Sequence, residues 1–165
     1  MMSDDTYTGP HAVTLDAWIA TAPFEDLLGM KIVSAVQGHA ILTMPFRRSY
    51  AQGLGFMHGG ALVSLADTAL AMAAKSLLPP ETVFATTSIN NRFLLPVTCG
   101  IVTARAVMTG RCDRDLMGNA ELLDEQERVV MRFSAVFRVA WKSWTDVAEV
   151  LVRALPDSLD THPVD

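Results

Sequence analysis

The sequence has few cysteines and no excess of positive charge. Its 165 residues include only 2 cysteines, and Cys99 and Cys112 form no C-x-x-C pair. We therefore predict reduced core or boundary thiols in place of a disulfide framework. Basic residues number 13 against 18 acidic ones, for a formal net charge of −5. This balance argues against a nucleic-acid partner, which normally requires a basic surface.

Targeting and membrane signals are also missing. The first ten residues, MMSDDTYTGP, are acidic and lack the basic and apolar regions of a signal peptide. The apolar run after Gly60 is interrupted by Ser64 and Asp67 and ends at Lys75, which makes it too short and too polar to span a bilayer. We expect a cytoplasmic protein without membrane insertion.

What is present is a chain that is 50% hydrophobic and 19% charged, sufficient for one compact domain. We predict a flexible tail over 1–13, a domain over 14–142, and a C-terminal helix with a polar tail over 143–165.

Hydrophobic periodicity predicts the elements of this domain. Residues 14–29 read as a helix that begins at Thr14, breaks at Pro23 and ends with a short turn at Gly29. A β-hairpin over 31–46 follows, and then a long helix from about Gly59 to Leu78, ended by Pro79 and Pro80. Four β-rich runs complete the domain, over 82–96, 100–112, 116–126 and 128–141.

Consecutive strands of this length are expected to pair in antiparallel fashion. A helix that is apolar on most faces must be surrounded by other elements. Both requirements are met by an α+β fold in which one curved antiparallel sheet wraps around one long central helix.

The common catalytic motifs are absent. There is no G-x-S-x-G, H-E-x-x-H, P-loop or EF-hand pattern, and the four histidines are scattered along the chain. We therefore predict neither a metal site nor a bound cofactor.

The junction His58-Gly59-Gly60 opens the long helix. The first N–H groups of a helix lack intrahelical acceptors, and the helix dipole favours negative charge there. Glycine allows a ligand to approach the main chain, so a carbonyl oxygen could be stabilised there as it becomes an oxyanion. The alternative is that the two glycines only permit a tight turn into the helix.

Asp67 lies in the middle of the same helix with no cation three or four residues away. A buried carboxylate without a partner is costly or holds a proton. Asp67 either belongs to an exposed polar stripe, makes a structural hydrogen bond, or acts as nucleophile or general base. Eight residues separate it from Gly59, which is roughly 12 Å along a helix. A site that uses both residues on one carbonyl would therefore need Asp67 from a second subunit.

These residues carry a family resemblance. The stretch HGGALVSLADTA resembles the signature of hotdog-fold thioesterases of the phenylacetic-acid-degradation type, relatives of one class of 4-hydroxybenzoyl-CoA thioesterase. The similarity covers about residues 23 to 140 and includes PFEDLLGM and FLLPV. It implies a hotdog fold and hydrolysis of an acyl-CoA thioester at the interface of a homodimer or a dimer of dimers, with coenzyme A as part of the substrate.

The resemblance also implies roles for particular residues. The Gly59 N–H would be the oxyanion donor, and His58 would orient the loop. Gln52 would hold the thioester carbonyl or the attacking water. Asp67 of the partner subunit would be the nucleophile or general base.

Substrate contacts are implied as well. Gly60 would let the substrate approach the main chain. Some relatives carry a hydroxyl one turn after the acid, where this chain has Ala71, and others supply one from the next strand, where Thr86 and Thr87 are candidates. The candidates for binding the coenzyme A phosphates are Arg92, Arg105, Arg111 and Arg114. The candidates for lining an acyl pocket are Leu54, Phe56, Met57 and Met72.

Two other functions fit the same fold. One is an enoyl-CoA hydratase-like enzyme, which would use a histidine with an acid to move protons next to the thioester. The other is a non-catalytic acyl-CoA binding protein, which would need no nucleophile.

Overall fold

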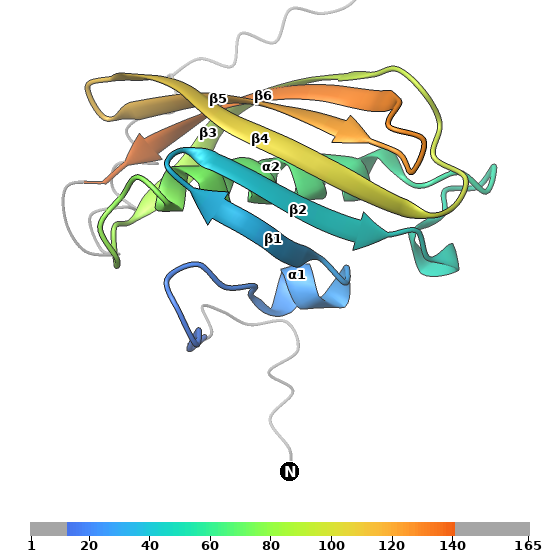
Figure 1. The fold of residues 1–165 in the computed structure, drawn as a ribbon, viewed down its shortest axis with the longest axis horizontal. Helices are drawn as coiled ribbons and strands as arrows, with labels where there is room; N and C mark the ends of the chain where they lie inside the picture. The colour runs from blue at the N-terminus through green and yellow to red at the C-terminus, as the bar shows by residue number, and fades with distance from the viewer. Residues whose placement is uncertain (1–12, 141–165) are drawn as a thin grey trace, which may run out of the picture.

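Six antiparallel strands pack against one long helix in the computed structural model, which describes residues 13–140 (Figure 1). This arrangement confirms the predicted α+β class. In chain order the elements are α1 (Pro23–Leu27), β1 (Lys31–Val36), β2 (His39–Pro45), the short 3-10 helix η2 (Arg48–Tyr50), α2 (Gly59–Lys75), β3 (Phe84–Phe93), β4 (Ile101–Cys112), β5 (Asp115–Leu123) and β6 (Val129–Val139). The predicted C-terminal helix and tail over 143–165 lie outside the described residues.

The order of strands in the sheet differs from the chain order. It is β1-β2-β4-β5-β6-β3, and every neighbouring pair is antiparallel. The expectation that all consecutive strands pair is therefore wrong for β3, which pairs with β6 and not with β4. Because β4 takes the free side of β2, β3 is left with the open side of β6. It becomes an edge strand alongside α2.

The helix α2 supplies much of the core. Nine of its 17 residues are buried, and the side chains of Leu65 and Leu70 are fully enclosed against sheet residues such as Leu42 and Phe137. The helix ends at Lys75, three residues before the predicted end. The hydroxyl of Ser76 donates to the carbonyl of Ala73 at 2.7 Å and accepts the N–H of Gly38 at 2.8 Å. These bonds join the end of α2 to Gly38 in the turn between β1 and β2.

The predicted helix before Pro23 is also wrong. Residues 14–22 form no helix, and α1 begins at Pro23 itself. The residue before a proline is pushed towards extended conformations, and Ala22 has φ −104° and ψ 173°. This segment nevertheless packs on α2, because the indole N–H of Trp18 donates to the Lys75 carbonyl at 3.0 Å.

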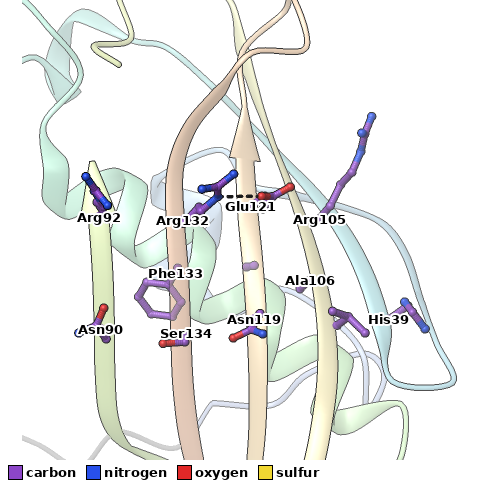
Figure 2. Close-up of a pocket in the computed structure, with 12 residues that line it drawn as sticks. His39, Asn90, Arg92, Arg105, Ala106, Asn119, Glu121, Arg132, Phe133 and Ser134 are labelled. Atoms are coloured by element: carbon purple, nitrogen blue, oxygen red, sulfur yellow. Dashed lines mark hydrogen bonds and ion pairs between the residues drawn. The ribbon is translucent and has the colours of Figure 1, made fainter. Parts of the chain in front are cut away.

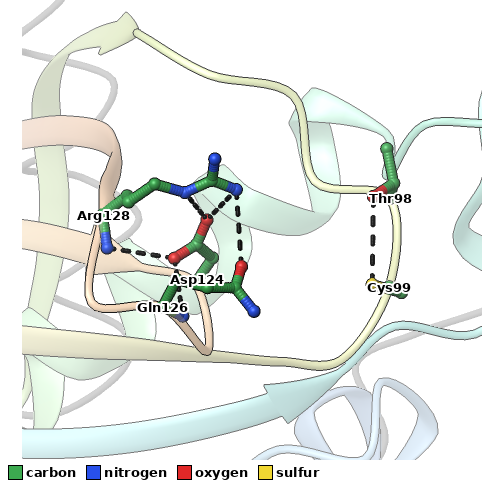
Figure 3. Close-up of polar contacts among 5 residues, drawn as sticks. All are labelled: Thr98, Cys99, Asp124, Gln126 and Arg128. Carbon is green, nitrogen blue, oxygen red and sulfur yellow. Dashed lines mark hydrogen bonds and ion pairs between the residues drawn. The ribbon is translucent and has the colours of Figure 1, made fainter.

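A buried carboxylate holds the turn between β5 and β6. Asp124 is 8% exposed and accepts hydrogen bonds from the N–H groups of Gln126 and Arg128 and from the Arg128 side chain (Figure 3). Three bonds to one side chain fix this turn, and with it the register of the two strands.

Both cysteines are free and exposed. Cys99 lies in the loop before β4, where the Thr98 hydroxyl is 3.9 Å from its sulfur (Figure 3), and Cys112 ends β4. The prediction of reduced thiols agrees with this, whereas a core position does not. No helix among residues 13–140 is long and apolar enough to cross a membrane.

Candidate active site

The N-terminus of α2 is capped by a histidine. His58 is the N-cap residue, with extended backbone angles, and its Nδ1 accepts the Gly60 N–H at 2.9 Å. Its own N–H donates to the Tyr50 carbonyl at 2.7 Å, which ties the preceding loop to the helix. His58 therefore fixes the direction in which the helix begins and leaves the Gly60 N–H occupied.

Gly59 presents a free donor beside an aromatic ring. Within residues 13–140 its N–H has no hydrogen-bond acceptor, at the positive end of the α2 dipole. A Cβ at Gly59 would lie 3.0 Å from Cζ of Phe93, on β3. A larger residue would displace this ring slightly, so the end of β3 packs closely against the start of α2.

An apolar cleft of about 400 Å³ opens at this junction. Gly59 and Gln52 contribute its polar groups. The rest of its lining is apolar and comes from the preceding loop, from α2 and from the segment after β3: Phe56, Met57, Leu62, Phe93, Leu94, Leu95, Pro96 and Val97. Such a surface suits a hydrocarbon group with a polar atom at one end.

Gln52 is held in a defined orientation. Its side-chain Oε1 accepts the N–H of Leu54 at 2.7 Å. An N–H can only bond to the oxygen of an amide, so the Gln52 NH₂ points elsewhere. Gln52 is thus prepared to donate a hydrogen bond. Leu54, at the tip of the same loop, is 80% exposed.

Asp67 is bonded to the strand beside it. The Thr86 hydroxyl donates to both carboxylate oxygens, at 3.0 and 3.3 Å. Burial raises the pKa of the Asp67 carboxyl above its ordinary value, and the hydrogen bond from Thr86 opposes this rise. Asp67 is half-buried, so it combines a raised basicity with access from outside.

The backbone of β3 decides which threonine reaches Asp67. The β3–β6 register shifts between Thr86 and Ser88. Thr86 faces α2, whereas the hydroxyl of Thr87 donates to the Val136 carbonyl at 3.1 Å. A one-residue bulge of this kind leaves no mark in the hydrophobic pattern, so the sequence left both threonines open.

The predicted site residues are distributed over four places. Gln52, His58, Gly59 and Gly60 meet at the start of α2, and Asp67 and Thr86 meet two turns along it. The four arginines do not gather at either point. Arg111 and Arg114 contact Asp113 in the β4–β5 turn, and Arg92 and Arg105 lie at a separate recess on the other face of the sheet.

The predicted acyl-pocket residues are split in the same way. Phe56 and Met57 line the cleft, whereas Met72 is buried in the core at 4% exposure. Sequence reasoning missed Phe93 as a site residue. The apolar run FLLPV was the available signal, but only the pairing of β3 beside α2 shows that it faces Gly59.

Comparisons with known proteins point to one family. The family model described as the thioesterase superfamily matches residues 54–131. The chain is 32% identical over 107 residues to the 1,4-dihydroxy-2-naphthoyl-CoA hydrolase of Listeria monocytogenes. The match covers 64% of this chain and 86% of that protein. It is 31% identical over 133 residues to the acyl-coenzyme A thioesterase PaaI of Escherichia coli, and this match covers 80% of this chain and 89% of the PaaI protein. Among solved structures, a mutant of the phenylacetic acid degradation protein PaaI from Thermus thermophilus matches with a TM-score of 0.64 and 31% identity, covering 70% of this chain and 98% of that one.

Proposed function

The chain belongs to the thioesterase superfamily as a hotdog-fold acyl-CoA thioesterase of the phenylacetic-acid-degradation type, and on this basis we propose that two subunits share each active site. The observation that carries the proposal is the separation of the two functional groups on α2. Gly59 offers a backbone donor at the start of the helix, and Asp67 offers a carboxylate eight residues later. Thioester hydrolysis needs both a donor to the carbonyl oxygen and a group that promotes attack on the carbonyl carbon. Within one chain these two groups are too far apart to act on the same carbonyl.

The edge strand β3 supports a way to bring them together. Thr86 near its start bonds to Asp67, and Phe93 at its end lies against Gly59. If β3 pairs with a second copy of itself about a two-fold axis through Asn90, Phe93 comes opposite the bulge at Thr86 and Thr87 of the partner subunit. Gly59 then approaches Asp67 of the partner subunit. The pairing also covers an edge whose Ile89 and Phe93 are 47% and 51% exposed.

In this site the start of α2 binds the thioester carbonyl. The Gly59 N–H and the Gln52 NH₂ donate to its oxygen, which gains negative charge as the carbonyl becomes tetrahedral. The hydrogen bond from the Leu54 N–H occupies the Gln52 oxygen, which favours this donor role over accepting a hydrogen bond from the attacking water. His58 positions the donors through the turn that it caps.

Asp67 of the partner subunit supplies the attack on the carbonyl carbon. As general base it takes a proton from water, and the hydroxide adds to the carbonyl. As nucleophile it forms a mixed anhydride that water then cleaves. In both routes the carbon–sulfur bond breaks and coenzyme A leaves as thiolate. A single turnover in heavy-oxygen water, followed by analysis of Asp67 for the label, tests for the nucleophilic route. Only that route can place the heavy oxygen in the Asp67 carboxylate.

The lining of the cleft favours an apolar acyl group. Apart from Gln52 and the Gly59 main chain, every residue around it is hydrocarbon or thioether. We propose no metal or cofactor, because the carboxylate, the backbone donor and water complete the reaction. A cytoplasmic location stays a prediction.

Release of free thiol from a panel of acyl-CoAs tests the function. The panel should contain short, long and aromatic acyl groups, with crotonyl-CoA hydration measured in parallel. We expect thiol release with apolar acyl groups and no hydration. Hydration of crotonyl-CoA, or tight acyl-CoA binding without thiol release, would contradict the proposal.

A further inference from the structure

The sheet carries a polar recess on the face opposite the cleft. It has a volume of about 650 Å³ and is lined by residues of β2, β4, β5, β6 and β3. Figure 2 shows side chains from neighbouring strands around it, among them Asn90, Arg92, Arg105, Asn119, Glu121 and Arg132. Arg92 and Phe93 are neighbours on β3, and strand alternation sends their side chains to opposite faces. The recess is therefore separate from the apolar cleft.

One row of the recess contains four charged residues side by side. The sheet register pairs Arg92 with Arg132, Arg132 with Glu121, and Glu121 with Arg105. Arg132 donates to Glu121 at 3.1 Å, and Arg105 donates to Glu127 at 2.6 Å (Figure 2 shows the first of these pairs). Arg92 has no ion pair among residues 13–140. Among these residues, Arg92 at the β3 end of the row is therefore the arginine without an acidic partner.

Like charges directly opposite each other on paired strands repel and destabilise the sheet. Arg92 and Arg132 occupy such a pair, and nothing acidic among the described lining residues lies between them. An anion between the two guanidinium groups would relieve the repulsion. The next row adds the amide of Asn90 and the hydroxyl of Ser134, which are themselves paired across β3 and β6.

We propose that the recess binds a phosphate group between Arg92 and Arg132. Two guanidinium forks match the oxygens of a phosphate, and Asn90 and Ser134 can donate to the same group. The chain has a net charge of −5, so it does not attract anions in general. The site depends on this one juxtaposition and does not rest on thioester hydrolysis. The phosphate can come from solution or from coenzyme A.

Phosphate titration of the full chain tests the proposal. Inorganic phosphate is added at constant ionic strength against chloride, and binding is followed by calorimetry and by the rise in Tm. We expect saturable binding to the wild type, and at least about tenfold weaker binding in Arg92→Gln and in Arg132→Gln. Arg48→Gln is the matched control, because it removes one exposed arginine outside the recess and should bind phosphate like the wild type.

In phosphate-free buffer Arg92→Gln should be at least as stable as the wild type, because the repulsion with Arg132 is removed. This comparison separates loss of the site from loss of the fold. The proposal is overturned if the wild type does not bind phosphate, or if Arg92→Gln binds it equally well. It is also overturned if Arg92→Gln changes only the oligomeric state, which would make the recess a contact between subunits.

A second titration identifies the source of the phosphate. Coenzyme A and dephospho-coenzyme A are compared on the wild type and Arg92→Gln. If coenzyme A is the source, removal of its 3′-phosphate and removal of the Arg92 charge each weaken binding. If the phosphate is free in solution, Arg92→Gln loses inorganic phosphate and keeps its affinity for coenzyme A. Both results support a phosphate site.

Discussion

The two positions on α2 that we propose to be functional, Gly59 and Asp67, differ in their surroundings and in the chemical group that they present. At Gly59 the surroundings are apolar, the donor is a backbone N–H, and glycine leaves room for the Phe93 ring. At Asp67 the group is an acid, half-buried and bonded to Thr86. The N–H of Gly59 can stabilise negative charge on a carbonyl oxygen, whereas the Asp67 carboxylate can act as a base or nucleophile. Neither is sufficient for hydrolysis, so the comparison predicts different consequences when each is altered.

Removing the acid should have the largest effect. We expect Asp67→Asn to lower kcat by at least about 100-fold, because an amide cannot accept the proton or attack the carbonyl. Binding of coenzyme A should be unchanged, because the proposed role of Asp67 is at the thioester carbonyl, which free coenzyme A lacks. Steady-state kinetics and calorimetry measure the two quantities. Asp26→Asn, on an exposed residue of α1, is the matched control. Wild-type rates in Asp67→Asn on several acyl-CoAs would show that Asp67 is not catalytic.

Altering the donor position should cost less. Gly59→Ala keeps the N–H but puts a methyl group against Phe93, so the ring must shift. We expect kcat/KM to fall about tenfold through misplacement of the carbonyl. Phe93→Leu in the same chain should recover part of the loss by making room. A loss as large as that of Asp67→Asn, with no recovery, would mean that the substrate itself needs the space at Gly59.

The hydrogen bond from Thr86 to Asp67 can be tested separately from the two positions themselves. Its hydrogen bond lowers the pKa of Asp67 against the effect of burial, so Thr86→Val should raise that pKa further. The acidic limb of the kcat profile should move to higher pH, and kcat near neutral pH should fall about fivefold. Thr87→Val should not move the limb, because Thr87 bonds to Val136. Equal shifts in both variants would exclude a specific Thr86–Asp67 interaction.

The smallest effect concerns stability. The folded-state pKa of Asp67 is raised, so its ionised form costs stability once the pH exceeds the unfolded pKa, and the cost is complete above the folded pKa. Asp67→Asn should therefore raise Tm at neutral pH, by about 1–2 °C because the residue is only half-buried. The difference should vanish in acid. Thermal unfolding across a pH series checks this, and a lower Tm at neutral pH would contradict it.

Local patterns were sufficient for most elements of the fold. The period-two alternation of Met131, Phe133, Ala135 and Phe137 predicted β6, and those side chains are buried as expected. The position of β3 was not predictable in this way, because strand order depends on which edges remain free after distant strands have paired. The helix before Pro23 failed for a local reason, the extended conformation that proline imposes on Ala22.

For the site, the sequence identified positions but not partners. Asp67 could be recognised as unusual because helical spacing shows its neighbours. Thr86 was separated from Thr87 only by the bulge in β3. The arginine pair depends on the β3–β6 register, which sets Arg92 opposite a residue 40 positions away in the chain. Contacts across strands are long-range in sequence, so composition and periodicity carry no record of them.

Subunit complementation tests the shared site most directly. Asp67→Asn and Gln52→Ala chains, each nearly inactive alone, are unfolded, mixed in equal amounts and refolded together. If each site takes Gln52 from one chain and Asp67 from the other, a mixed dimer has one intact site, and random mixing should restore roughly a quarter of wild-type activity. If both residues act within one chain, every site in the mixture keeps a defect. Activity would then stay at the mean of the two separate variants, which would contradict the two-subunit site.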